Sequence, residues 1–226
     1  MENQLKEIIS SKGLQDISID IVESILDNEI TNEALKEIPI IKSLVAIRNV
    51  HNSFSDRIFI KKALTVLLEL GNLDSEKRQK FLDDLDDKFT SGSEKILLAI
   101  EKLDTYEKCK IFGRLSLLRA ENKIDVDDFL RLTKVIQDAY IEDLFLIKNL
   151  GDGRNKITEE EYYPLISLGL IFQERSRPTP ITKKKTSTFF DEETYEGGQI
   201  EFYYYLTLVG SKLLKHFDDL FPEENE

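Results

Sequence analysis

The sequence predicts a mostly α-helical protein, in which a helical bundle over residues 1–150 is followed by a small α+β module with a long β-hairpin over residues 151–226. Three observations support this fold class. Apolar residues recur with the helical period through most of the first 150 residues. Gly151 and Gly153 then interrupt the pattern. After them, residues 199–206 alternate with the period of two that is typical of a strand.

The composition excludes several classes of protein. The chain has 226 residues, of which 41% are hydrophobic and 33% charged, so it is long enough to bury one large core or two small ones. One cysteine and two histidines exclude a disulfide scaffold and a zinc finger. Residues 1–7 have neither the basic segment nor the apolar stretch of a secretory signal, and we expect a cytoplasmic protein.

The net charge of −12 restricts the partners of the chain. A protein this acidic repels nucleic acid and anionic lipid as a whole, so any binding of either must be local. Two segments have a local excess of cations. The first is a candidate basic patch, formed by Lys42, Arg48, Arg57, Lys61 and Lys62. The second is a candidate surface for nucleic acid or another partner, formed by Arg175, Arg177, Lys183, Lys184 and Lys185.

The longest apolar run covers residues 38–47 and is interrupted by Lys42. It has about half the length of a transmembrane helix, so we expect no transmembrane segment. With the cations that follow it, the run is a candidate for attachment to a membrane surface through residues 38–62. A core helix with a solvated basic edge is the favoured interpretation.

Start and stop signals divide the first 89 residues into helices. Asp16 is a candidate cap for the helix that follows it, and Thr31 for the next, which Pro39 kinks or interrupts. A helix from Ser55 ends before Gly71 and is apolar around most of its circumference, which predicts a place at the centre of the bundle. A helix over residues 74–89 carries an acidic cluster, which we interpret as a solvated face rather than a metal site.

The next 60 residues predict three more helices. Residues 93–103 and 104–120 are expected to form an antiparallel pair, and residues 125–150 one long helix. An Asn-x-Ile pattern at residues 28–33, 122–127 and 155–160 resembles half of a calcium-binding loop. The oxygen ligands that such a loop requires are absent, so we expect helix caps at Thr31, Asp125 and Thr158 instead.

The last third of the chain predicts a mixture of helices and strands. A helix over residues 158–168 is followed by a strand at 169–173, a possible strand at 186–190 and the alternating strand at 199–206. Thr207 is expected to cap a final helix. Tyr203 and Tyr205 point away from the core in this alternation, which makes them candidates for a protein interface.

The order Leu165-x-x-Leu168-Gly169-Leu170-Ile171, a hairpin, and Leu206-Thr207-x-x-Gly210-x-x-Leu213 resembles the end of a winged-helix domain. The resemblance is to bacterial regulators of the multiple-antibiotic-resistance repressor family and covers residues 157–218. It implies that the helix before the Gly-Leu-Ile strand enters the major groove and that the hairpin is the wing. Here that helix begins with Glu159, Glu160 and Glu161, which disfavours binding to duplex DNA.

Residues 37–150 resemble a group of uncharacterised bacterial helical proteins. The resemblance is carried by Glu37-Ile38-Pro39-Ile40-Ile41-Lys42-Ser43-Leu44-Val45 and by residues 54–62. Some members of that group are linked to mobile elements or to abortive-infection-like phage defence. The resemblance implies a regulatory or defence role and no particular chemistry.

The sequence selects no catalytic centre. His51 and His216 are far apart and are expected at the surface, and Cys109 lies on an apolar face without a neighbouring histidine. Phosphate-binding, dinucleotide-binding and metalloprotease motifs are absent from the sequence. We therefore expect no enzymatic activity, no cofactor and no metal.

These observations predict a non-enzymatic bacterial protein that acts in regulation or in protein interaction, within phage defence or a mobile element. Two alternatives remain. One is a winged-helix transcription regulator that contacts DNA through the hairpin cations. The other is a peripheral membrane protein attached through residues 38–62.

Overall fold

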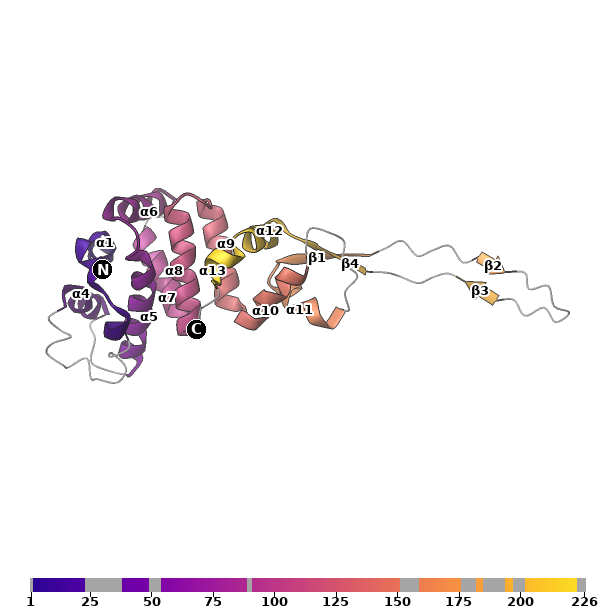
Figure 1. Ribbon diagram of the computed structural model, residues 1–226, viewed down its shortest axis with the longest axis horizontal. Coiled ribbons are helices and arrows are strands. Elements are labelled where there is room, and N and C mark those ends of the chain that lie inside the picture. The colour runs from indigo at the N-terminus through magenta and orange to yellow at the C-terminus, as the bar shows by residue number, and fades with distance from the viewer. Residues whose placement is uncertain are drawn as a thin grey trace. The chain divides into compact units, whose positions relative to one another are not determined.

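The computed structural model describes residues 2–22, 38–48, 54–88, 91–150, 159–175, 182–184, 194–196 and 202–222. The protein is mostly helical (Figure 1). It divides into two compact units: unit 1 consists of residues 1–138 and 216–226, and unit 2 of residues 139–215. Among the described residues, no helix combines the length and the apolar character needed to cross a membrane.

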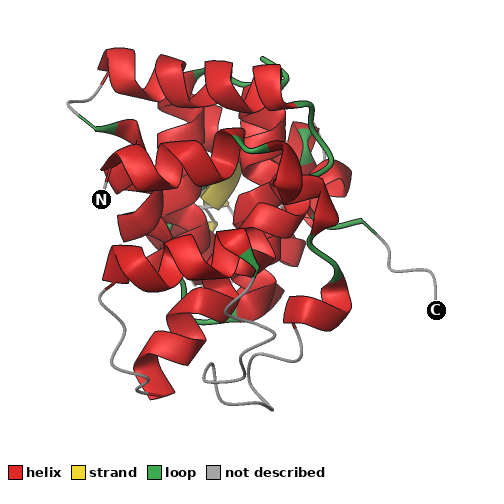
Figure 2. Cartoon of the chain, turned by 90° about the vertical axis from the view of Figure 1, so that its left-hand side faces the viewer, coloured by secondary structure: helices red, strands yellow, loops and turns green. Residues whose placement is uncertain are grey.

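Unit 1 is a bundle of helices (Figure 2). Its elements are α1 (Glu2–Ser10), η1 (Lys12–Asp16), α4 (Pro39–Arg48), α5 (Phe54–Leu70), α6 (Ser75–Lys88), α7 (Gly92–Lys102), α8 (Tyr106–Ala120), α9 (Val126–Asp138) and α13 (Phe217–Leu220). Pro39 begins α4, a position in which its missing N–H group costs nothing.

Helix α5 lies at the centre of this bundle, which confirms the expectation from its apolar circumference. It packs against α4, α7, α8 and η1. Its closest neighbour is α8, where a Cβ atom on Gly113 would lie 2.7 Å from Glu69 Cβ and 3.2 Å from the Val66 carbonyl oxygen. The absence of a side chain at Gly113 therefore sets the close approach of the two helices.

Two expectations about the helices are corrected. The expected antiparallel pair forms two helices, α7 and α8, but α8 packs mainly on α5 and α9, and α7 mainly on α6 and α5. The expected long helix over residues 125–150 is three elements: α9, α10 (Ile141–Phe145) and η2 (Leu146–Leu150). The helical spacing continues across the break because Ile141, Leu144 and Ile147 bury one face of the new elements.

The break falls at Tyr140, whose backbone is extended, and residues 139–150 belong to unit 2. Unit 2 thus begins before the expected boundary at residue 150, and Gly151 and Gly153 lie outside the described residues. The chain also returns to unit 1 at His216, so unit 2 is inserted between two segments of unit 1.

Side-chain caps fix several helix starts. Asp125 accepts a hydrogen bond from the Asp128 amide at 2.7 Å, as the sequence predicts. Ser18, rather than Asp16, caps the helical residues 19–22 by accepting from the Ile21 amide at 3.4 Å. Asp16 is instead the last residue of η1. The other two expected caps, Thr31 and Thr158, lie outside the described residues.

Unit 2 combines helices with two pairs of strands. After α10 and η2 come α11 (Glu159–Ser167), β1 (Ile171–Arg175), β2 (Thr182–Lys184), β3 (Thr194–Glu196), β4 (Phe202–Leu206) and α12 (Leu208–Lys215). Strand β1 pairs with β4 and β2 with β3, both antiparallel. The possible strand at residues 186–190 lies outside the described residues.

The turn between α11 and β1 contacts the turn between β4 and α12. Gly169 ends α11 with φ of +69°, a conformation that glycine adopts without strain. Thr207 caps α12, as predicted: its amide donates to the Leu170 carbonyl at 2.9 Å, and its Oγ1 accepts from the Gly210 amide at 3.1 Å. The Gly-Leu positions at 169–170 and the Thr-x-x-Gly positions at 207–210, which carry the winged-helix resemblance, therefore lie next to each other in the structure.

Candidate interaction surface

The β1–β4 pair has two different faces. Its register places Phe172 opposite Tyr205 and Glu174 opposite Tyr203. Because side chains alternate along a strand, these four residues share one face, and the buried Ile171 and Tyr204 lie on the other. We call Phe172, Glu174, Tyr203 and Tyr205 the outer aromatic face.

Two rings of the outer aromatic face contact each other. The rings of Phe172 and Tyr205 are stacked, with centroids 5.2 Å apart and an angle of 20° between their planes. Phe172 is 49% exposed, and Tyr203 and Tyr205 are half-buried. Two tyrosines that sequence alternation predicts to point outward thus share a face with Phe172, a residue that alternation within β4 alone does not identify.

Exposed large apolar side chains concentrate in unit 2. Among the described residues nine are exposed, and the six that belong to unit 2 are Tyr140, Phe145, Tyr163, Phe172, Phe202 and Leu208. Exposed apolar side chains mark an interaction surface when they form one contiguous patch rather than scattered single residues. Of these six, Phe172 lies on the outer aromatic face, and Phe202 lies on the other face of the β1–β4 pair.

The hairpin cations are placed only in part. Arg175 is exposed and, by alternation, lies on the face of Ile171 and Tyr204 rather than on the outer aromatic face. Lys183 and Lys184 lie in β2, opposite Tyr195 and Thr194. Arg177 and Lys185 are outside the described residues.

Three members of the basic patch have partners within unit 1. Lys62 Nζ donates to the Leu103 carbonyl at the end of α7, where a helix favours a cation. Lys61 Nζ lies 4.7 Å from the centre of the Tyr106 ring. Arg57 lies 5.7 Å from the centre of the Phe54 ring. Lys42 is exposed on α4, and Arg48 is the last residue of that helix.

The acidic cluster of α6 is not simply a solvated face, which corrects the expectation. Lys6 Nζ lies 2.7 Å from Asp83 Oδ1 and 3.1 Å from Asp86 Oδ2, which ties α1 to α6. Hydrogen bonds from Lys6 and Gln79 to the Asp83 carboxylate outweigh partial burial and lower its pKa. Asp84 pairs with Arg119 of α8. Because Lys6 and Arg119 come from other helices, sequence spacing alone does not reveal these two ion pairs.

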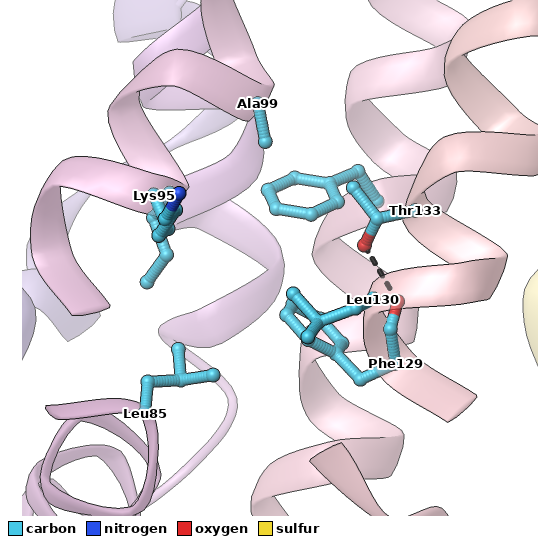
Figure 3. Close-up of a pocket in the computed structure, with 8 residues that line it drawn as sticks. Leu85, Lys95, Ala99, Phe129, Leu130 and Thr133 are labelled. Atoms are coloured by element: carbon cyan, nitrogen blue, oxygen red, sulfur yellow. Dashed lines mark hydrogen bonds between the residues drawn. The ribbon is translucent and has the colours of Figure 1, made fainter. Parts of the chain in front are cut away.

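A small cavity lies between the helices of unit 1 and has a volume of about 30 Å³. Its walls are mostly apolar, and the Thr133 hydroxyl donates to the Phe129 carbonyl at 2.7 Å (Figure 3). The lining residues are Leu85, Lys95, Ile96, Ala99, Phe112, Phe129, Leu130 and Thr133. The space is comparable to one water molecule, so it is too small for an organic cofactor.

The structure corrects the placement of His216. The sequence predicts a surface histidine, but the residue is only 6% exposed and lies next to the buried Phe217 in unit 1. His216 Nδ1 lies 3.2 Å from Asp219 Oδ2. His51 is outside the described residues, in which no group of three or more metal-ligating side chains is found.

Cys109 is fully buried, as its position on an apolar face predicts. Burial raises the pKa of its thiol from an ordinary value of 9.0 to about 12. At neutral pH the thiol is therefore protonated and is a poor nucleophile.

This pKa predicts a specific loss of stability in alkali. Between pH 9 and pH 12 the thiol ionises in the unfolded chain but not in the folded one, so stability falls as the pH rises. Relative to Cys109→Ala, the wild-type chain should lose up to about 1.4 kcal/mol of unfolding free energy per pH unit in this range. Urea denaturation of both proteins at about pH 8 and about pH 10 measures the difference. An equal pH dependence of unfolding free energy in the wild type and in Cys109→Ala would contradict a raised thiol pKa at Cys109.

Comparisons with protein-family models, with curated proteins and with solved structures find no match for this chain.

Proposed function

We propose that the chain is a non-enzymatic protein-interaction protein, in which unit 2 is a winged-helix-like module that binds another protein through its outer aromatic face. The stacked and exposed Phe172, flanked by Tyr203 and Tyr205, is the observation that carries the proposal. Aromatic side chains are enriched at protein interfaces because each buries a large area at a low cost in conformational entropy.

The winged-helix-like assignment rests on the order of elements in unit 2. Helix α11, strand β1, strand β4 and helix α12 follow one another in the order of the resemblance, with β1 and β4 antiparallel. The regulatory role, in bacterial phage defence or a mobile element, rests on the resemblance of residues 37–150 described above.

Charge favours a protein partner over nucleic acid. Glu174 lies within the outer aromatic face, opposite Tyr203, where a phosphate would be repelled. Helix α11 begins with three consecutive glutamates. The chain as a whole carries a net charge of −12.

Affinity purification of variants from native cells tests the proposal. We expect a stoichiometric protein partner that survives nuclease treatment and is lost from the double variant Phe172→Ser with Tyr203→Ser. Leu98 is 44% exposed on α7 of unit 1, so Leu98→Ser is the matched control and should retain the partner. A partner bound equally by the double variant would contradict the proposal.

Two other outcomes identify the alternatives. Recovery of nucleic acid that depends on Lys183, Lys184 and Lys185, and that falls with added salt, would support the transcription regulator. Pelleting with anionic vesicles that Lys42→Glu abolishes would support membrane attachment. Lys42 is exposed, whereas Lys62 binds the Leu103 carbonyl and Lys61 lies over the Tyr106 ring. A change at Lys42 therefore tests membrane binding without removing these two contacts.

A further inference from the structure

Helix α13 completes unit 1 although it follows unit 2 in the chain. The chain leaves unit 1 after Asp138 and returns to it at His216. The polypeptide chain therefore passes between the two units twice, after Asp138 and before His216. The second passage leads directly into α13.

A small number of side chains hold α13 on α8. Phe217 and Leu220 are almost fully buried, and α13 packs against α8. Arg114 Nη1 donates to the Leu220 carbonyl at 3.2 Å, and Arg114 Nε lies 3.4 Å from Glu69 Oε1. Glu69 therefore orients the guanidinium that caps the end of α13.

Opposite charges lie near each other at this contact. The segment carries Asp218 and Asp219 between its two buried side chains, Arg114 is on α8, and Lys123 is three residues after that helix. A hydrogen bond to Glu121 is the main cause that raises the pKa of Lys123, and the charge of Asp219 contributes. Arg114 and Lys123 each pair with an acid of unit 1 as well, Glu69 and Glu121 respectively.

The docked element is short and holds little structure of its own. Helix α13 has four residues, and the side chain of its N-cap residue, His216, makes no capping hydrogen bond. It follows α12 after this one residue, but α12 belongs to unit 2 and α13 to unit 1. The place of α13 in unit 1 therefore depends on its contact with α8.

We propose that residues 216–221 are a reversible latch on a peptide-binding surface of α8, which recognises one turn of helix with an aromatic residue followed three positions later by leucine. The occupant is the chain's own segment, with Phe217 and Leu220 as its anchors. Opening the latch releases from unit 1 the segment that follows unit 2 and frees the surface of α8 that it covers.

A competition experiment in the full-length chain tests this latch. The probe is a fluorescent, capped peptide of residues 214–222, and the receptor is the double variant Phe217→Ser with Leu220→Ser. We expect this variant to bind the peptide at least about ten-fold more tightly than the wild-type chain, whose own segment competes. A peptide with the same two substitutions should not bind, and adding Arg114→Met to the variant should weaken binding.

Hydrogen exchange in the wild-type chain supplies an independent measurement. The Leu220 and Phe221 amides donate to the His216 and Phe217 carbonyls and should exchange at least about 100-fold faster than the amides in the middle of α8. Lys215→Ser, at an exposed position, is the control and should behave as wild type in both experiments. Equal protection of α13 and α8, an unfolded double variant, or a folded one that does not bind the peptide would overturn the proposal.

Discussion

Replacing Arg78 with methionine should lower the free energy of unfolding of unit 1 by about 3–5 kcal/mol. The guanidinium is fully buried and donates to the carbonyls of Ile9 at 2.6 Å and Ser11 at 2.7 Å. It also donates to the Leu73 carbonyl and lies 3.5 Å from that of Leu70.

These carbonyls lie at the ends of α1 and α5, where helices leave acceptors unsatisfied and favour a cation. Burial lowers the pKa of the guanidinium, but arginine stays charged at neutral pH. Methionine fills a similar volume but has no hydrogen-bond donor. The substitution therefore leaves the buried carbonyl oxygens without partners, which costs about 1–3 kcal/mol for each carbonyl before the surrounding structure relaxes.

Urea denaturation followed by circular dichroism measures the effect. Lys134→Met is the matched control, because Lys134 forms only an exposed ion pair with Asp138, and it should change stability by less than about 0.5 kcal/mol. Arg78→Lys should recover little, since an ammonium group cannot reach three separated carbonyls at once. A loss below about 1 kcal/mol for Arg78→Met would show that water replaces the guanidinium.

Replacing Gly210 with alanine should destabilise unit 2 by about 3 kcal/mol or more. A Cβ atom at this position would lie 2.0 Å from the Leu170 carbonyl oxygen and 2.9 Å from its carbon. Both atoms are backbone and are held by the hydrogen bond from the Thr207 amide, so they cannot move aside cheaply.

The sign of this effect separates packing from helix propensity. Alanine is favoured over glycine inside a helix by about 1 kcal/mol, so propensity alone predicts stabilisation. Ser211→Ala, at the next and exposed position of α12, is the control in which propensity should dominate. Thermal denaturation of both variants, followed by hydrogen exchange of β1 and β4, measures the difference. A Gly210→Ala variant as stable as wild type would mean that α12 is placed differently.

The sequence predicts the elements of this fold better than their partners. The centre of the bundle follows from the apolar circumference of α5, and the caps at Asp125 and Thr207 follow from residue type. The break at Tyr140 was missed because an apolar face continues across it with helical spacing.

Long-range polar contacts also cannot be predicted from the local sequence pattern. Arg78 lies in a charged helix and has the sequence environment of a surface residue, and its role depends on carbonyls up to 69 positions away. The return of His216 to unit 1 is likewise a contact between distant segments. For the candidate surface, alternation identified Tyr203 and Tyr205, but Phe172 required the register of β1 against β4.

Photo-crosslinking in native cells tests the central claim most directly. A benzophenone amino acid replaces Phe172 on the outer aromatic face or, as the control, the exposed Leu98 of unit 1. We expect irradiation at position 172 to give a discrete, nuclease-resistant protein adduct that position 98 does not give. No adduct at position 172, or the same adduct from both positions, would contradict the claim that this face binds a protein.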